Sequence, residues 1–148
     1  MSKSRLALFV AFCCVAIYGC SQNSPKGIDV SHHQGDINWN KVAKEPIGFV
    51  YIKATEGETY VDSKFKKNIV GAKKVGLPVG VYHYFRMTSG AHKQFKNFYN
   101  TVKKYKIDLI PIVDVETSDD KSTKVLQDSL DVFISLVKAK FGVIPMIY

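Results

Sequence analysis

Two acidic residues, Asp114 and Glu116, follow an apolar run that reads Leu-Ile-Pro-Ile-Val at positions 109–113. Burying one unpaired carboxylate is costly, and burying two side by side costs more. The acids therefore need an open cleft, charged partners or a chemical role. On a β-strand, residues i and i+2 point to the same side, about 6.6 Å apart. We expect both carboxylates to face one side at the end of a strand.

A third acid, Asp29, lies near the corresponding end of an earlier apolar run at 27–31. In parallel α/β folds, ligands bind at the carboxyl ends of the strands, so the three acids are expected to converge on one mouth. Close carboxylates push their pKa values apart, so one keeps a proton while another stays charged. That combination suits cleavage of a glycosidic bond. The same trio suits binding of Mg²⁺ or Ca²⁺, so both interpretations stay open here.

Apolar runs alternate with amphipathic segments along the rest of the chain, which is typical of βαβ units and a parallel sheet. The runs predict strands at 27–31, 49–54, 79–85, 110–116 and 145–148. Helical spacing and stop signals predict a turn with a short helix at 36–43 and helices over 63–75, 89–106 and 123–140. Right-handed crossovers then favour a doubly wound sheet or a barrel, both of the α/β class.

The first twenty residues differ in composition from the rest. A basic start with Lys3 and Arg5 precedes an uncharged, mostly apolar stretch at 6–18. That stretch is too short for a membrane span and is typical of a signal peptide. Its end, Ile-Tyr-Gly-Cys at 17–20, resembles the lipobox of bacterial lipoproteins. We predict a signal peptide at 1–20, lipidation at Cys20 and a tether at 21–26; secretion after cleavage nearby is the alternative.

The cysteines and the charge narrow the functional classes. All three cysteines lie in the leader, so the remaining chain has no thiol nucleophile, disulfide or cysteine-based zinc site. The formal net charge is +8; without the two basic leader residues, 19 basic residues face 13 acidic ones, which leaves +6. A basic exported protein suits an anionic cell-wall polymer or membrane surface, although a solubilising surface charge explains it equally well. The aromatic-basic pattern of nucleic-acid readers is missing from the sequence, and we expect no nucleic-acid partner.

Five motifs are informative when they are taken together. They read GIDVSHHQG at 27–35, KATEG at 53–57, Asp62 with Phe65 and Asn68, GVYHY at 80–84 and PIVDVE at 111–116. In order and spacing they resemble family 25 glycoside hydrolases, the N-acetylmuramidase lysozymes, from Gly27 to Tyr148. The resemblance implies an irregular (β/α) barrel of the TIM type with a groove at the carboxyl ends of its strands. It implies hydrolysis of the β-1,4 bond between N-acetylmuramic acid and N-acetylglucosamine in peptidoglycan.

The resemblance also implies roles for the three acids. Glu116 would be the general acid. Asp114 would be the anion that steadies the intermediate, as a nucleophile or by holding the substrate's acetamido group. Asp29 would orient the pair and tune its charge. The resemblance implies no metal and no cofactor, and its partners are peptidoglycan glycan strands, with a membrane contact through Cys20.

Four further residues are candidates for substrate binding: Tyr82, Asp62, Gln34 and Glu56. The motif position of Tyr82 implies a hydrogen bond in the groove. Asp62 either lines the groove or caps the helix expected near residue 63. Glu56 either lies at the mouth or is a solvated loop acid. The neighbouring histidines at 32–33 lack a third ligand at a metal-binding spacing, so we expect them in a loop beside the groove.

The resemblance ends before a barrel can close. A closed eight-stranded barrel typically needs roughly 250 residues, and few have less than 200. The 122 residues from Gly27 onward supply about five strands, so we expect an incomplete barrel with an exposed strand edge. We expect a truncated gene product, a wrongly assigned reading frame or a fragment. Two functions stay open: an exported muramidase of the bacterial cell envelope, lipid-anchored or secreted, and an inactive remnant that at most binds cell-wall glycan. A metal-dependent hydrolase is the third hypothesis.

Overall fold

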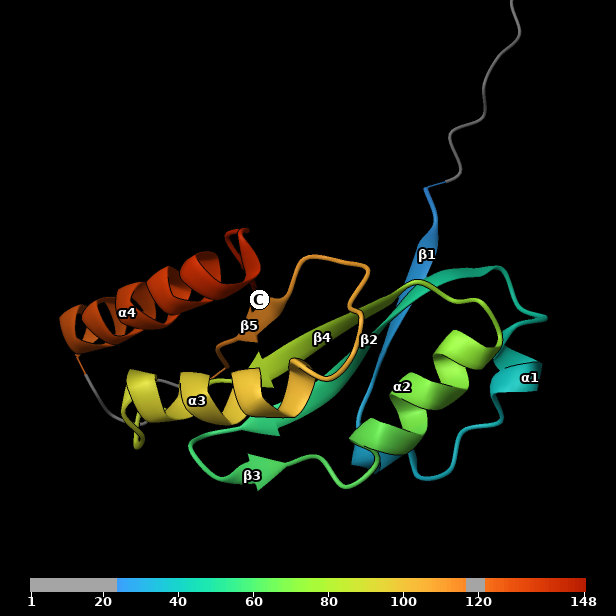
Figure 1. Ribbon diagram of the computed structural model, residues 1–148, viewed down its shortest axis with the longest axis horizontal. Helices are drawn as coiled ribbons and strands as arrows, with labels where there is room; N and C mark the ends of the chain where they lie inside the picture. The colour runs from blue at the N-terminus through green and yellow to red at the C-terminus, as the bar shows by residue number, and fades with distance from the viewer. Residues whose placement is uncertain (1–23, 117–121) are drawn as a thin grey trace, which may run out of the picture.

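The computed structural model describes residues 24–116 and 122–148 as one α/β unit (Figure 1). Six strands form its sheet: β1 (Lys26–Val30), β2 (Ile47–Glu56), β3 (Tyr60–Val61), β4 (Val79–Tyr84), β5 (Ile112–Asp114) and β6 (Met146–Ile147). The helical elements are η1 (His32–Gln34), α1 (Trp39–Val42), α2 (Phe65–Lys74), α3 (Ala91–Val102) and α4 (Thr123–Phe141).

The sheet has the parallel, sequential order that the βα alternation predicts. Its main path is β1-β2-β4-β5-β6, with every neighbouring pair parallel, while β3 pairs antiparallel with β2. Helices α2 and α3 contact β2, and α4 packs along α3, as Figure 1 shows. The α/β fold class with about five barrel strands is therefore confirmed. Within the described residues, no strand pairs with the outer edge of β1 or β6, so the sheet curls but does not close.

The hydrophobic core lies between the strands and the helices. Strand residues Val50, Ile52 and Val81 are completely buried, as are Ile69 of α2 and Phe133 of α4. These side chains alternate along the strands with residues of the opposite face, as a pleated strand requires. Each fully buried large apolar side chain contributes roughly 1.5–3 kcal/mol to folding. The core therefore fixes one face of the sheet and leaves the concave face available for a site.

Several element boundaries differ from the expected ones. Strand β1 begins at Lys26, the last residue of the expected tether, and β5 ends at Asp114 instead of continuing to Glu116. Helix α3 ends at Val102 because the chain turns there, with the backbone N–H of Tyr105 donating to its carbonyl oxygen. The hairpin strand β3 was not predicted. The other expected elements lie within a few residues of their predicted positions.

Two helix signals have clear structural counterparts. Gly142 ends α4 in the left-handed conformation, with φ of 73° and its N–H donating to the carbonyl of Lys138. Trp39 of α1 is buried against Gly71 of α2, so its indole ring packs the two helices together. In the part of the chain that the structure describes, no helix has the length and apolarity needed to cross a bilayer. The predicted signal peptide and Cys20 lie outside the described residues.

Candidate active site

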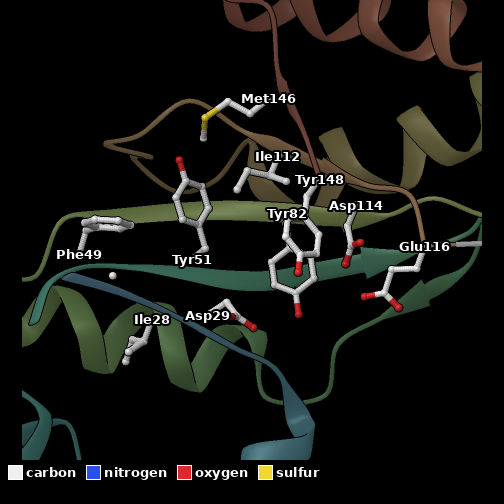
Figure 2. A pocket seen from close by; sticks show the side chains of 11 residues that line it. Ile28, Asp29, Phe49, Tyr51, Tyr82, Ile112, Asp114, Glu116, Met146 and Tyr148 are labelled. Carbon is white, nitrogen blue, oxygen red and sulfur yellow. The ribbon is translucent and has the colours of Figure 1, made fainter. Parts of the chain in front are cut away.

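A cavity of about 520 Å³ occupies the concave side of the sheet (Figure 2). Its polar lining comes from the carboxyl ends of the strands and from the segment after β6, with Asp29, Tyr82, Asp114, Glu116 and Tyr148. Its apolar lining comes from positions earlier along the strands, with Gly27, Ile28, Phe49, Tyr51, Ile112 and Met146. One end of the cavity is thus a carboxylate cluster, and the remainder resembles the interior of an open barrel.

The three acids of the sequence motifs share this cavity. Asp29 is exposed near the end of β1, Asp114 is the last residue of β5, and Glu116 is exposed two residues further on. Strands β2 and β4 separate β1 from β5 in the sheet, so its curl brings the acids together. Figure 2 shows their side chains directed into the same space beside Tyr82. The three acids thus line one cavity at the carboxyl ends of the strands.

Asp114 is the buried member of these three acids. Asp114 is only 7% exposed, and its Oδ1 has no hydrogen-bond partner within the described residues. Burial and, after it, the charge of Glu116 raise the pKa of Asp114 to about 6. Lys53 opposes this rise, and Asp29 and Glu56 add smaller contributions to it. Desolvation and neighbouring like charge both disfavour the ionised form of a carboxyl group. Asp114 therefore keeps its proton to a higher pH than an ordinary aspartate but is mostly ionised at neutral pH.

Glu116 has a different environment. Its carboxylate is exposed, and its Oε2 accepts a hydrogen bond of 3.2 Å from the hydroxyl of Tyr84. Burial and the charge of Glu116 raise the pKa of Tyr84, so the phenol stays protonated and acts as the donor. The family resemblance implies that Glu116 carries the transferable proton. The two carboxyl groups of one motif thus differ in burial and in partners.

Tyr82 lies between the acids on β4. Its side chain is half-buried, and burial followed by the charges of Asp29, Asp114 and Asp62 raises its pKa well above the usual range. The hydroxyl therefore remains protonated at any physiological pH and can donate a hydrogen bond within the cavity. The sequence could not decide which face of β4 points inward, and the cavity lining shows that it is the face of Tyr82.

Two of the candidate substrate-binding residues hold loops in place beside the cavity. Asp62 is 3% exposed; its Oδ2 accepts from the backbone N–H of His32 at 3.0 Å and contacts the ring Nδ1 at 2.7 Å. Its Oδ1 accepts from the backbone N–H of Lys64 at 2.9 Å, just before α2. Gln34 closes a capping box on η1, with its Oε1 accepting from the backbone N–H of Ser31 at 2.7 Å. Neither residue belongs to the cavity lining.

The third candidate outside the lining, Glu56, is bound by two cations. Its Oε2 lies 2.6 Å from the Nζ of Lys53, and its Oε1 lies 2.7 Å from the Nη2 of Arg86. Burial opposes ionisation, but hydrogen bonds and charge from both cations keep the pKa of Glu56 below its usual value. Sequence reasoning overlooked Lys53 as a site residue, although a lone charge inside the apolar run of β2 was an available signal. Arg86, which follows β4, carried no such signal.

The described residues contain no group of three or more histidine, cysteine, aspartate or glutamate side chains arranged to hold a metal ion. The rings of the paired histidines of η1 lie with their centroids 4.0 Å apart at a tilt of 37°, and the ring Nδ1 of His32 contacts Asp62. The donor set of the cavity is therefore one of carboxylates and phenols. That set can supply a proton, an anion and hydrogen-bond donors.

Comparisons with known proteins show which family the chain resembles. An autolytic lysozyme of Clostridium acetobutylicum is 37% identical over 108 residues, which is 73% of this chain and 33% of the relative. A family 25 glycosyl hydrolase structure from Bacillus anthracis superposes with a TM-score of 0.79 at 36% identity, covering 84% of this chain and 59% of that one. The muramidase structure from Trichobolus zukalii gives 0.78 at 32% identity, covering 84% and 65%. The chain thus spans a third of the clostridial relative and roughly three-fifths of these structures. Residues 28–148 match the family model described as Glycosyl hydrolases family 25, and the chain belongs to that family.

Proposed function

We propose that this chain carries the catalytic carboxylates of a peptidoglycan hydrolase that cleaves the β-1,4 bond between N-acetylmuramic acid and N-acetylglucosamine. The observation that carries the proposal is the convergence of Asp29, Asp114 and Glu116 on one cavity in a family 25 chain. Relatives that bear the names lysozyme and muramidase support the same activity.

The proposed mechanism divides the work between a proton donor and an anion. Glu116 donates its proton to the glycosidic oxygen as the bond to the anomeric carbon breaks. Asp114 is ionised above a pH of about 6 and faces the developing positive charge. Its unpartnered Oδ1 either attacks the anomeric carbon or accepts the N–H of the substrate's acetamido group. Asp29 adds negative charge beside the pair, and Tyr82 donates a hydrogen bond to the sugar.

Release of reducing ends from purified cell walls tests this proposal. Glu116→Gln keeps the size of the side chain but removes the transferable proton, so we expect a loss of at least about 100-fold. Asp128→Asn on the solvent side of α4, where Asp128 meets Lys124 at 3.6 Å, is the matched control and should keep full activity. Activity that Glu116→Gln leaves unchanged would remove that residue from the acid role. Glycan binding without any cleavage by the parent chain would favour the binding-only function instead.

EDTA separates the carboxylate mechanism from a metal-dependent one. Activity that persists in EDTA is the expected result, because the proposed steps use side-chain carboxyl groups alone. Loss of activity in EDTA, restored by adding Mg²⁺ or Ca²⁺, would support the metal-dependent hydrolase.

We further propose that the protein is exported to the bacterial cell envelope, with residues 1–20 as signal peptide, Cys20 as lipidation site, 21–26 as tether and 27–148 as catalytic part. The support is the basic start, the apolar stretch and the lipobox-like end of the leader. Radiolabelled palmitate should be incorporated by the parent chain and not by Cys20→Ala. An unlabelled parent chain that appears in the medium would instead indicate plain secretion.

A further inference from the structure

A β-bulge in β2 places two opposite charges on one face of the strand. Lys53 pairs with Tyr82, but Thr55 pairs with His83, so the residue between them is inserted in the ladder. In a regular strand, residues three apart point to opposite faces, and one extra residue restores them to the same face. Lys53 and Glu56 consequently meet at 2.6 Å on the cavity side of the sheet. Lys53 is 6% exposed, and a cation so buried requires a partner.

The ring of Tyr84 is held by these charges. The Nζ of Lys53 lies 4.7 Å from the ring centroid, and the guanidinium carbon of Arg86 lies 4.6 Å from it. Glu56 joins the two cations, because Arg86 donates to its Oε1 from Nε at 2.9 Å and from Nη2 at 2.7 Å while Lys53 donates to its Oε2. Cations over an aromatic face attract its quadrupole, and a forked arginine fixes orientation as well as charge. We call Lys53, Glu56 and Arg86 the charge clamp.

The clamped tyrosine reaches the proposed acid. The hydroxyl of Tyr84 donates to Oε2 of Glu116 at 3.2 Å. Glu116 lies two residues after the last residue of β5 and is exposed, and the last backbone pairing before it is that of Val115 with Tyr148, so strand pairing does not fix its carboxyl group. Strand β4 pairs with both β2 and β5, so a tyrosine on β4 is placed to transmit order from the clamp to the acid.

We propose that Tyr84 is a positioning residue for Glu116 and that the charge clamp of Lys53, Glu56 and Arg86 holds its ring in place. This inference rests on the proposed function, in which Glu116 is the general acid. A hydrogen bond to Oε2 leaves Oε1 to carry the proton that moves to the glycosidic oxygen, which takes the electrons of the breaking bond to the anomeric carbon. The same bond then stabilises the carboxylate that remains. Glu56 acts through Tyr84 in this arrangement, without touching the sugar.

The first test separates kcat from KM with soluble, uncross-linked peptidoglycan strands as substrate. Tyr84→Phe removes the hydroxyl and keeps the ring over the clamp, so kcat should fall about 10- to 100-fold while KM changes little. Tyr99→Phe, in the helix layer on α3, is the matched control and should match the parent. An unchanged kcat for Tyr84→Phe, beside an inactive Glu116→Gln, would overturn the inference and leave the proposed function intact.

The second test is a double-mutant cycle between the clamp and the tyrosine. Arg86→Leu should lower kcat, and Arg86→Lys should restore part of it, because lysine keeps a cation near the ring and Glu56. In the Tyr84→Phe background, Arg86→Leu should add little further loss, since the hydroxyl that it positions is already absent. An equal loss in both backgrounds would show that Arg86 acts elsewhere and would overturn the role of the clamp.

A third readout does not depend on activity. The ¹³Cζ resonance of Tyr84 at neutral pH reports the hydrogen bond of its hydroxyl, and it should shift in Glu116→Gln and in Arg86→Leu but not in Asp128→Asn. If the parent chain cleaves nothing, the proposed function fails while this measurement still decides the arrangement. A resonance that neither substitution moves would overturn the inference.

Discussion

Asp114 illustrates how one buried carboxyl group links activity to stability. Its side chain is buried at the end of β5, and one of its oxygens lacks a partner within the described residues. Burial and the adjacent charge of Glu116 raise its pKa to about 6 from 3.8. Ionising Asp114 in the folded protein therefore costs more than ionising it in the unfolded chain. The protein should therefore be less stable at neutral pH than a variant that lacks that charge.

Asp114→Asn should accordingly stabilise the fold at pH 7. Between about pH 4 and pH 6 the folded state holds a proton that the unfolded state has released, so the parent loses stability as the pH rises through this window. Asparagine has no such loss, and we expect its free energy of unfolding at pH 7 to exceed the parent's by about 1–3 kcal/mol. The gain should shrink toward zero below pH 4. Urea unfolding at several pH values measures both, and a difference that does not vary with pH would contradict this account.

His83 has the opposite pH dependence. It is completely buried, and burial lowers its pKa to about 4, so it is neutral near pH 7. Its Nδ1 lies 2.8 Å from the hydroxyl of Thr55, and its Nε2 lies 3.1 Å from Oε1 of Gln94. Because that amide's nitrogen already donates to the carbonyl oxygens of Arg86 and Ser89, Nε2 must carry the ring proton.

We therefore expect stability to fall through His83 as the pH drops from about 6.5 to about 4, since the unfolded chain takes up a proton that the folded state refuses. His83→Gln should lower the free energy of unfolding at pH 7, because one of two buried hydrogen bonds is lost. The variant should lack this His83 contribution, so its stability should fall less than the parent's as the pH drops through this acidic window. Denaturation series at pH 7, 5.5 and 4 test the prediction, and a slope parallel to the parent's would refute it.

The sequence indicated the acids but not the residues that hold them. Asp114 and Glu116 were recognisable because acids after a buried run need a reason, and Asp29 because strand ends meet. The positions of Lys53 and Tyr84 depend on a β-bulge and on contacts between strands. Both follow from how the strands pair, which the local sequence pattern does not show. The sequence pattern therefore predicted the three acids, but it could not predict the charge clamp beside them.

Helix α2 requires a residue without a side chain at position 71, where Gly71 faces Trp39. Glycine normally weakens a helix by about 1 kcal/mol relative to alanine. Here a Cβ at position 71 would overlap the indole ring of Trp39, which α1 packs against this helix. Gly71→Ala should therefore destabilise the protein by about 1–3 kcal/mol despite its better helix propensity. Lys66→Ala on the exposed side of α2 is the control, and thermal unfolding of both variants checks the sign. A stabilised Gly71→Ala would show that Trp39 can move away freely.

The sequence predicted the positions of elements well where a hydrophobic periodicity extends over many residues. It predicted them less well where strand pairing determines the bounds. Helix α4 matches its predicted span within one residue because apolar residues recur through it and Gly142 stops it. Strand β3 has two residues, too few for any alternation to show, and it exists because a hairpin at Gly57 returns the chain to β2. Strand β5 has only three residues, so the apolar run at 110–116 overestimated its length.

The whole molecule is a curled sheet whose concave face is partly apolar. Glycines at 27 and 80 leave room for the rings of Phe49 and Tyr51, where any Cβ would overlap them. The Tyr51 hydroxyl donates to the carbonyl of Ile110 at 2.9 Å, which ties β2 to the segment before β5. The cavity therefore extends from the carboxylates to packed aromatic rings on the concave face of the sheet.

The open edge of this sheet predicts self-association of the chain. Strand β6 pairs with β5 on one side, and within the described residues its other side is unpaired, with Ile147 58% exposed. Exposed apolar edge strands are templates for pairing between molecules. Ile147→Lys should reduce the amount of oligomers and aggregates that size-exclusion chromatography with light scattering detects, because a charge on β6 opposes edge-to-edge pairing of strands from two molecules. Val70→Lys, at an equally exposed site on α2 away from any edge, should leave them unchanged. Equal effects of the two lysines would mean that net charge, and not the β6 edge, governs association.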